Sequence, residues 1–185
     1  MINRELYMEQ ITPFIDKPFV KVITGIRRCG KSVVLRLIRE ELLRRGVSED
    51  YIIYMNFESF EWIDMKEAKA LYAHIREATK APGKYYILLD EIQEVTDWEK
   101  AVNAFLVDLD VDIYVTGSNS RLLSSEFSTY LAGRYVAFHI MTLSFREYLL
   151  FHDLPLTISV SDRKTEFLKY LRMGGFPAIH TANYD

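Results

Sequence analysis

Apolar residues along the chain follow two patterns that alternate. Short, nearly continuous apolar runs are typical of strands buried on both faces of a parallel sheet. Five such runs are present, at 19–24, 51–57, 85–91, 111–116 and 134–141. Between them, apolar residues recur every three or four positions, which predicts amphipathic helices at 1–18 (ending at Pro13), 32–45, 64–79, 96–109 and 121–131. The alternation predicts an α/β fold with three layers, in which a five-stranded parallel sheet carries helices on both faces.

The last part of the chain lacks a further strand pattern. Two helices are expected there, at 144–150 and 161–173, separated by a loop that contains Pro155. We therefore predict a core over residues 1–142 and a small C-terminal helical part over residues 143–185. Three stretches match the capping-box pattern of helix N-termini: Asp64–Glu67, Thr96–Glu99 and Ser144–Glu147.

The most specific chemical signal is the stretch Gly25–Ser32, GIRRCGKS, which matches the phosphate-binding P-loop pattern G-x-x-x-x-G-K-S. It lies between a predicted strand and a predicted helix, as this loop requires. Its backbone N–H groups and the positive end of the helix dipole are expected to bind phosphate oxygens. Lys31 is expected to reach the β- and γ-phosphates, and the Ser32 hydroxyl to ligate Mg²⁺. The predicted nucleotide-binding residues are Gly25, Ile26, Arg27, Arg28, Cys29, Gly30, Lys31, Ser32 and Val33.

Two acidic residues, Asp90 and Glu91, follow the third apolar run. They fall at the carboxyl end of a parallel strand, where α/β folds bind their ligands. Asp90 is placed to hold Mg²⁺, usually through water, and Glu91 to accept a proton from an attacking water. One strand separates this one from the P-loop strand in sequence. That spacing favours the branch of P-loop folds in which a further strand also separates the two in the sheet.

Two further polar residues are candidates for catalysis. Asn119 follows the fourth strand, where its amide could orient the attacking water or contact the γ-phosphate, or serve only in a turn. Arg134 begins the fifth strand, where it could supply positive charge to the transition state of its own chain or of a neighbouring subunit. A structural ion pair is the other interpretation of Arg134. Cys29 is interpreted as a tolerated small residue rather than a nucleophile.

Composition narrows the functional classes. The 185 residues are 49% apolar and 26% charged, which is ordinary for one globular domain with a substantial core. A net charge of −3 gives no support to nucleic-acid binding by this chain alone. No apolar run approaches the roughly 18 residues of a membrane span, and the N-terminus is not a signal peptide. A single cysteine excludes an internal disulfide and a CxxC metal site. These features favour a cytoplasmic protein without a membrane partner.

Several motifs together resemble one protein family. They are ITGIRRCGKS, YYILLDEIQEVTDWEKAVNAFL, YVTGSNSRLLSSEFSTYLAGRY, LSFREYL and GGFP. Over about residues 3 to 178 the chain resembles the bacterial and archaeal AAA-type predicted ATPases that carry a C-terminal domain of unknown function. The resemblance implies an AAA-like core with Walker A at Gly25–Ser32, Walker B at Asp90 and Glu91, and a sensor-type polar residue at Asn119. Since family members are usually longer, it also implies an N-terminal ATPase fragment, whose helical lid would have to come from residues 144–173.

The predicted function is Mg²⁺-dependent ATP binding and hydrolysis to ADP and phosphate, coupled to a conformational change. The alternative is a nucleotide-gated regulatory module that holds ATP or ADP and hydrolyses little. A small-molecule kinase is less favoured, because Glu91 beside Asp90 suits the activation of water and no arginine-rich lid is evident. A homo-oligomer and a protein partner both stay open, with Arg27 and Arg28 as the place to look for a partner-facing surface.

Overall fold

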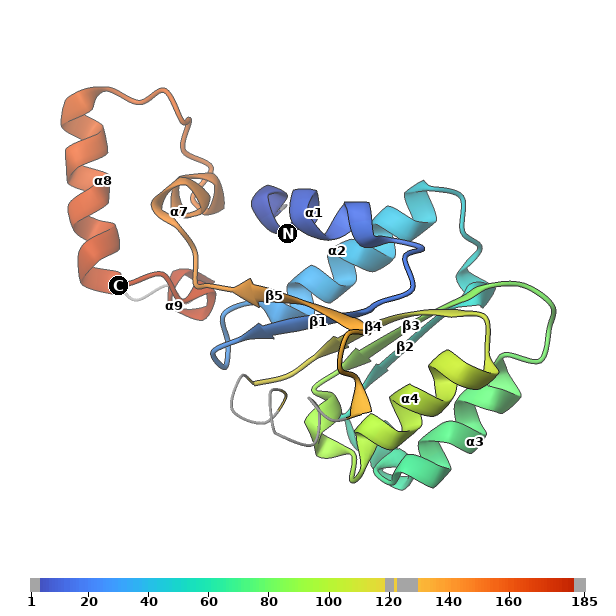
Figure 1. Cartoon of the computed structure of the whole chain (residues 1–185). Helices are drawn as coiled ribbons and strands as arrows, with labels where there is room; N and C mark the ends of the chain where they lie inside the picture. The colour runs from blue at the N-terminus through green and yellow to red at the C-terminus, as the bar shows by residue number, and fades with distance from the viewer. Residues whose placement is uncertain (1–3, 119–121, 123–129, 182–185) are drawn as a thin grey trace.

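The centre of the molecule is a five-stranded sheet in the order β2-β3-β4-β1-β5, with every neighbouring pair parallel (Figure 1). The structure is a computed structural model and describes residues 4–118, 122 and 130–181. The strands are β1 Val20–Gly25, β2 Ile52–Asn56, β3 Tyr85–Asp90, β4 Val111–Thr116 and β5 Tyr135–Ile140. The predicted five-stranded parallel sheet is confirmed, and β4 separates the P-loop strand from the Asp-Glu strand as the spacing indicated.

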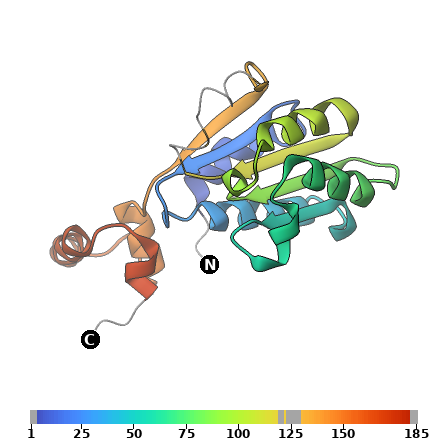
Figure 2. The same ribbon diagram turned by 90° about the horizontal axis from the view of Figure 1, so that it is seen from below.

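Helices cover both faces of this sheet (Figures 1 and 2). Helices α1 (Glu5–Ile11) and α2 (Lys31–Arg44) lie on one face, and α3 (Ala68–Ala78) and α4 (Trp98–Asp108) on the other. Each face has its own apolar core of fully buried side chains, and full burial of one such side chain stabilises the fold by about 1.5–3 kcal/mol. Among them are Ile11, Leu35, Ile38 and Leu42 on the α1–α2 side, and Leu71, Ile75, Val102 and Phe105 on the α3–α4 side.

Two of the three predicted capping boxes are wrong, and one tertiary contact explains both. Glu67 and Thr96 pair as an isolated parallel β-bridge, which holds Glu67 in an extended conformation. Helix α3 therefore begins only at Ala68, after a short 3₁₀ segment at Phe60–Met65, and α4 begins after Asp97 with no side-chain cap. Long-range pairing thus overrides the local preference of both stretches for a helix N-terminus.

The third capping box is confirmed and opens a C-terminal group of helices. Ser144 caps α7 (Phe145–Phe151), and α8 (Val160–Met173) and α9 (Pro177–Thr181) follow. These helices lie beyond the carboxyl edge of the sheet, where β5 ends (Figures 1 and 2). The expected helix at 121–131 falls mainly outside the described residues, and the boundary between 142 and 143 stays a prediction.

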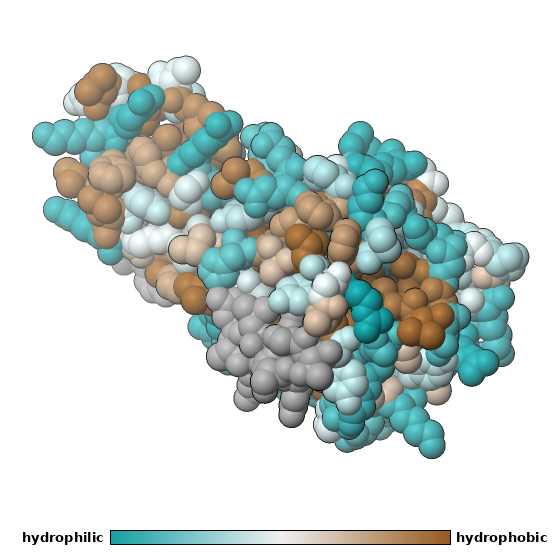
Figure 3. Space-filling view, viewed as in Figure 1, coloured by the Kyte–Doolittle hydropathy of each residue, from teal (hydrophilic) through white to brown (hydrophobic). Residues whose placement is uncertain are grey.

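Helix α8 contacts α7 and the segment before it with only part of its surface. Its Glu166 accepts a hydrogen bond from the Tyr148 hydroxyl at 2.9 Å, and its Tyr170 hydroxyl donates to the Leu143 carbonyl at 2.8 Å. Apolar residues elsewhere on α8, among them Leu168 and Leu171, are exposed, and brown side chains gather at this end of the molecule in Figure 3. Within the described ranges, no helix combines the length and the apolar character that crossing a membrane requires.

A buried ion pair joins β1 and β4 near their amino ends. The Lys21 ammonium pairs with the Asp112 carboxylate, and both side chains are almost completely buried. Asp112 also accepts hydrogen bonds from the Tyr114 hydroxyl at 2.8 Å and the Asp16 N–H at 2.9 Å. Burial lowers the pKa of Lys21, and the charge of Asp112 opposes that shift. The ion pair and its hydrogen bonds offset the free-energy cost of removing both charges from water.

We expect Asp112→Ala to lower the free energy of unfolding by about 3–5 kcal/mol, because it leaves the Lys21 charge buried without its partner. Equilibrium denaturation in urea measures this loss. Glu77→Ala is the matched control: it breaks an exposed pair with Lys80 and is expected to leave the midpoint nearly unchanged. Equal midpoints for Asp112→Ala and the wild type would contradict the structural role given to this pair.

Candidate nucleotide-binding site

The loop between β1 and α2 owes its shape to two glycines. Gly25 has a φ of 151°, and a Cβ atom there would lie 2.3 Å from the Ile140 carbonyl oxygen. Gly30 has a φ of 107° and is the N-cap residue of α2. Only glycine adopts such backbone conformations at low cost, and only glycine fits so close to a neighbouring strand. The P-loop pattern therefore has the strand–loop–helix setting that it requires.

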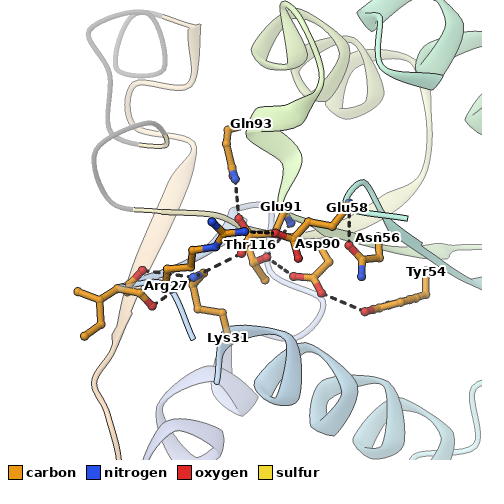
Figure 4. Close-up of polar contacts among 11 residues, drawn as sticks. Arg27, Lys31, Tyr54, Asn56, Glu58, Asp90, Glu91, Gln93 and Thr116 are labelled. Carbon is orange, nitrogen blue, oxygen red and sulfur yellow. Dashed lines mark hydrogen bonds and ion pairs between the residues drawn. The ribbon is translucent and has the colours of Figure 1, made fainter. Parts of the chain in front are cut away.

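Lys31, the first residue of α2, is folded back over this loop and is 4% exposed. Its ammonium donates to the carbonyl oxygens of Gly25 at 3.3 Å and Ile26 at 3.4 Å. It also lies 3.4 Å from Oε1 of Glu91, at the end of β3 (Figure 4). The P-loop lysine and the predicted catalytic acid, 60 positions apart in sequence, therefore meet in space.

Asp90 is completely buried beside them, and both of its oxygens accept hydrogen bonds. The Thr116 hydroxyl donates to Oδ1 at 2.5 Å, and the Tyr54 hydroxyl donates to Oδ2 at 3.1 Å (Figure 4). Burial and the adjacent carboxylate raise the pKa of Tyr54 to about 12, so this hydroxyl keeps its proton as a donor. Sequence reasoning missed Tyr54. Its position two residues before the end of β2, on the strand beside β3, is the signal that could have indicated it.

Glu91 is held in a left-handed conformation, with a φ of 54°. Its N–H donates to the Thr116 hydroxyl oxygen at 3.0 Å, so Thr116 links the two acids. Its Oε2 accepts a hydrogen bond from the Gln93 amide at 2.5 Å. Gln93 also has a buried Oε1 atom with no hydrogen-bond partner among the described residues. Gln93, a second residue that sequence reasoning missed, therefore orients the carboxylate of Glu91.

The other loop residues divide between solvent and core. Arg27 is largely exposed and pairs with Glu58 at 3.2 Å, and Ile26 and Arg28 are also exposed. Cys29 is fully buried, and burial raises the pKa of its thiol, which disfavours the reactive thiolate. This agrees with the interpretation of Cys29 as a tolerated small residue rather than a nucleophile.

A cavity of about 690 Å³ adjoins the loop. Gly30 and Val33 form its P-loop side, Arg4 and Glu5 come from the N-terminal segment, and the remaining lining comes from the C-terminal part: Leu143, Leu150, Phe151, Asp153, Pro177 and Thr181. Its volume lies in the range of roughly 300–1,000 Å³ typical of small-molecule sites. Most of this lining is apolar, which suits a flat organic group better than a phosphate.

Two predicted site residues are not part of this geometry. Arg134 lies at the amino end of the sheet, where its carbonyl accepts a hydrogen bond from Val20, whereas the P-loop follows the carboxyl end of β1. Its guanidinium donates to the Tyr130 carbonyl at 2.9 Å. The prediction that Arg134 acts in the site of its own chain is therefore wrong, because a residue that begins a parallel strand lies at the edge opposite the ligands. Asn119 lies outside the described residues.

Comparison with known proteins agrees with this geometry. A family profile described as AAA domain matches residues 17–149. The chain belongs to the AAA domain family. An uncharacterized protein of Haemophilus influenzae is 43% identical over 186 residues, which cover 99% of this chain and 46% of that relative. An uncharacterized protein of Methanocaldococcus jannaschii is 35% identical over 184 residues, which cover 97% of this chain and 39% of that relative. This AAA domain thus spans less than half the length of these two relatives.

Solved structures share the fold of this AAA domain at low identity. DnaA from Aquifex aeolicus, bound to AMPPCP, matches with a TM-score of 0.61 and 15% identity over 98% of this chain and 60% of that chain. The Aeropyrum pernix ORC1 protein, in complex with DNA, matches with a TM-score of 0.55 and 16% identity over 97% and 58%. At this level of identity the likeness establishes the α/β architecture. The family and the P-loop geometry together indicate a nucleotide-binding, ATPase-like domain.

Ser32 on α2 and Asp90 at the end of β3 carry oxygen atoms of the kinds that a magnesium ion takes as ligands. Ser32 is the second residue of α2 and is half-buried beside the loop. Each oxygen of Asp90 accepts one hydrogen bond from the protein and retains capacity for a bound water. Hydroxyl and carboxylate oxygens are the ligands that Mg²⁺ prefers, and it commonly keeps several waters. Ser32 and Asp90 are therefore the residues of this AAA domain that would hold the ion.

Proposed function

We propose that this AAA domain binds Mg²⁺–ATP and hydrolyses it to ADP and phosphate, coupled to a conformational change. The observation that carries the proposal is the contact between Lys31 and Glu91 at 3.4 Å, with Asp90, the last residue of β3, adjacent to Glu91 in the chain. A phosphate-binding cation, a metal-binding acid and a candidate base thus converge at one edge of the sheet. Phosphoryl transfer to water needs these groups.

The residues take defined roles in this reaction. The loop N–H groups and Lys31 bind the phosphates, which requires the ammonium to exchange Glu91 and the loop carbonyls for phosphate oxygens. Glu91 then accepts a proton from a water whose oxygen attacks the γ-phosphorus, and the bond to the β–γ bridging oxygen breaks to release ADP. A bound Mg²⁺ would neutralise charge on the β- and γ-phosphates. Tyr54 and Thr116 fix the orientation of Asp90 throughout.

The cavity beside the loop supports a nucleotide rather than inorganic phosphate as the ligand. It begins at Gly30 and Val33, next to the phosphate site, and continues between apolar side chains such as Leu143 and Phe151. A base and ribose can occupy such a space while the phosphates lie on the loop. The C-terminal helices supply much of the lining, so nucleotide binding there would engage α7 and α9, which is the basis for the proposed conformational coupling.

A second function, a nucleotide-gated module with little hydrolysis, is favoured by one observation. Both carboxylate oxygens of Glu91 have protein partners in this structure, Lys31 and Gln93. Each hydrogen bond or ion pair that a carboxylate accepts stabilises its charged form and so weakens it as a base. Bound nucleotide would remove Lys31, but Gln93 would remain. Two predicted contributors also stay proposals: Asn119 to position the water, and Arg134 to supply charge to a neighbouring subunit.

Measuring phosphate release from ATP distinguishes the hydrolase from the nucleotide-gated module. We expect the wild type to release phosphate from ATP in excess Mg²⁺ and to stop when EDTA removes the ion, because the phosphate charges are then no longer neutralised. Calorimetric titration with ATP on the same samples shows whether nucleotide binds. Tight binding with turnover at the level of a protein-free blank would favour the regulatory module, and no binding at all would contradict both functions.

A further inference from the structure

Arg4 is a buried charged residue that takes no part in the proposed reaction. Its side chain is 3% exposed, although it precedes the first helix. The guanidinium contacts three separate segments: Nε donates to Glu147 at 2.6 Å, Nη1 to the Cys29 carbonyl at 3.0 Å, and Nη2 to the Met141 carbonyl at 2.9 Å. These segments are α7, the P-loop and the end of β5. The planar guanidinium is suited to such a junction, because its donors have a fixed geometry.

The contact with the P-loop fixes the peptide that joins the loop to α2. The carbonyl of Cys29 faces Arg4, and all described peptide bonds are trans. In a trans peptide the C=O and N–H groups point in opposite directions. The N–H of Gly30, the N-cap residue of α2, is therefore directed away from the guanidinium. Phosphates bind to N–H groups at this end of a helix, so Arg4 helps to set the direction of the Gly30 N–H that a phosphate would meet.

The contact with α7 involves the residue that begins that helix. Oε1 of Glu147 pairs with Arg4, while Oε2 accepts a hydrogen bond from the Ser144 N–H at 2.8 Å. The Ser144 hydroxyl in turn accepts from the Glu147 N–H at 3.3 Å. One carboxylate thus both closes the capping box and holds Arg4. Helix α7 carries Leu150 and Phe151, which line the cavity beside the P-loop. Arg4 and Glu147 thus connect the P-loop to the helix that lines the cavity.

We propose that Arg4 is a positioning residue that couples nucleotide binding at the P-loop to α7 through Glu147. This inference rests on the proposed nucleotide site and adds the connection that carries its state to the C-terminal helices. Binding of phosphate holds the Cys29–Gly30 peptide, the peptide holds the guanidinium, and the guanidinium holds the start of α7. Because coupling between sites is reciprocal, loosening Glu147 also weakens nucleotide binding at the loop.

The test uses Arg4→Lys and Glu147→Gln, with Arg146→Lys as the matched control. Arg146 also joins α7 to α1, through Glu5 at 3.5 Å, but it is exposed and does not contact the P-loop. Two quantities are measured on each protein: the dissociation constant for ATP, and hydrogen exchange of the α7 amides with and without ATP. Thermal unfolding shows which variants are folded.

In the wild type, ATP is expected to slow hydrogen exchange in α7. Arg4→Lys and Glu147→Gln are expected to weaken ATP binding on the order of tenfold, as for the loss of one charge-assisted hydrogen bond, and to abolish the slowing in α7. Arg146→Lys is expected to match the wild type in both measurements. A purely structural role would lower the melting temperature while leaving the ATP effect on α7 intact.

The inference is overturned if the folded Arg4→Lys and Glu147→Gln proteins bind ATP as the wild type does, or if ATP still slows exchange in their α7 helices. Neither result contradicts the proposed nucleotide site, because the wild type binds ATP in both cases. Failure of the wild type itself to bind ATP is a different outcome, which contradicts the proposed function and the coupling with it.

Discussion

Replacing Lys31 by alanine is expected to weaken ATP binding on the order of 100-fold, the effect of losing two hydrogen bonds from a charged donor. The Lys31 ammonium is buried, lies at the end of the P-loop and has only loop carbonyls and Glu91 as its nearest described partners. The removal also leaves the Glu91 carboxylate beside the phosphate site without its counter-charge, and the resulting repulsion adds to the loss.

Calorimetric titration with ATP in excess Mg²⁺ measures this loss. Lys80→Ala is the matched control, since it removes an exposed lysine that pairs with Glu77. It is expected to bind ATP as the wild type does. Equal affinities for the Lys31→Ala and Lys80→Ala proteins would exclude the P-loop as the phosphate site.

The second large effect concerns catalysis. Glu91→Gln is expected to lower the rate of phosphate release by about 10²–10⁴-fold, the usual contribution of a positioned general base. The amide retains the shape of the carboxylate and can still contact Gln93, so the fold is expected to persist. What it loses is the capacity to accept a proton from the attacking water.

Glu58→Gln is the control for this substitution. Glu58 follows β2 at the same edge of the sheet and pairs with Arg27 (Figure 4). Both side chains are largely exposed. Its phosphate release is expected to equal that of the wild type. If both glutamine variants slowed by the same factor, general surface charge rather than proton transfer by Glu91 would be responsible.

The sequence was sufficient to predict the fold and to place Lys31, Asp90 and Glu91 at one edge of the sheet. Lys31 belongs to a local pattern whose backbone shape is fixed by nearby glycines, so no long-range information was needed. Asp90 and Glu91 end a buried strand, and the carboxyl ends of parallel strands share one edge. The same rule, applied to Arg134 at the start of β5, would have placed it at the opposite edge from the outset.

Residues that act through contacts across the fold were not predictable in this way. Tyr54 reaches Asp90 only because of the register between β2 and β3, and Arg4 meets the P-loop and α7 only after the N-terminal segment packs against both. The two misplaced helix starts have the same origin. Both stretches carry residues typical of a helix N-terminus, but the bridge between Glu67 and Thr96 determines where the two helices begin.

We infer that Lys31 and Glu91 belong to one nucleotide site, in which the carboxylate competes with phosphate for the ammonium. The most direct test is to measure the ATP dissociation constant and the rate of phosphate release together for Glu91→Gln. We expect the two quantities to change in opposite directions. ATP should bind as tightly as to the wild type or more tightly, because the competing charge is gone, whereas the rate should fall by about 10²–10⁴-fold. Binding and turnover that fall together, or a rate that does not change, would contradict it.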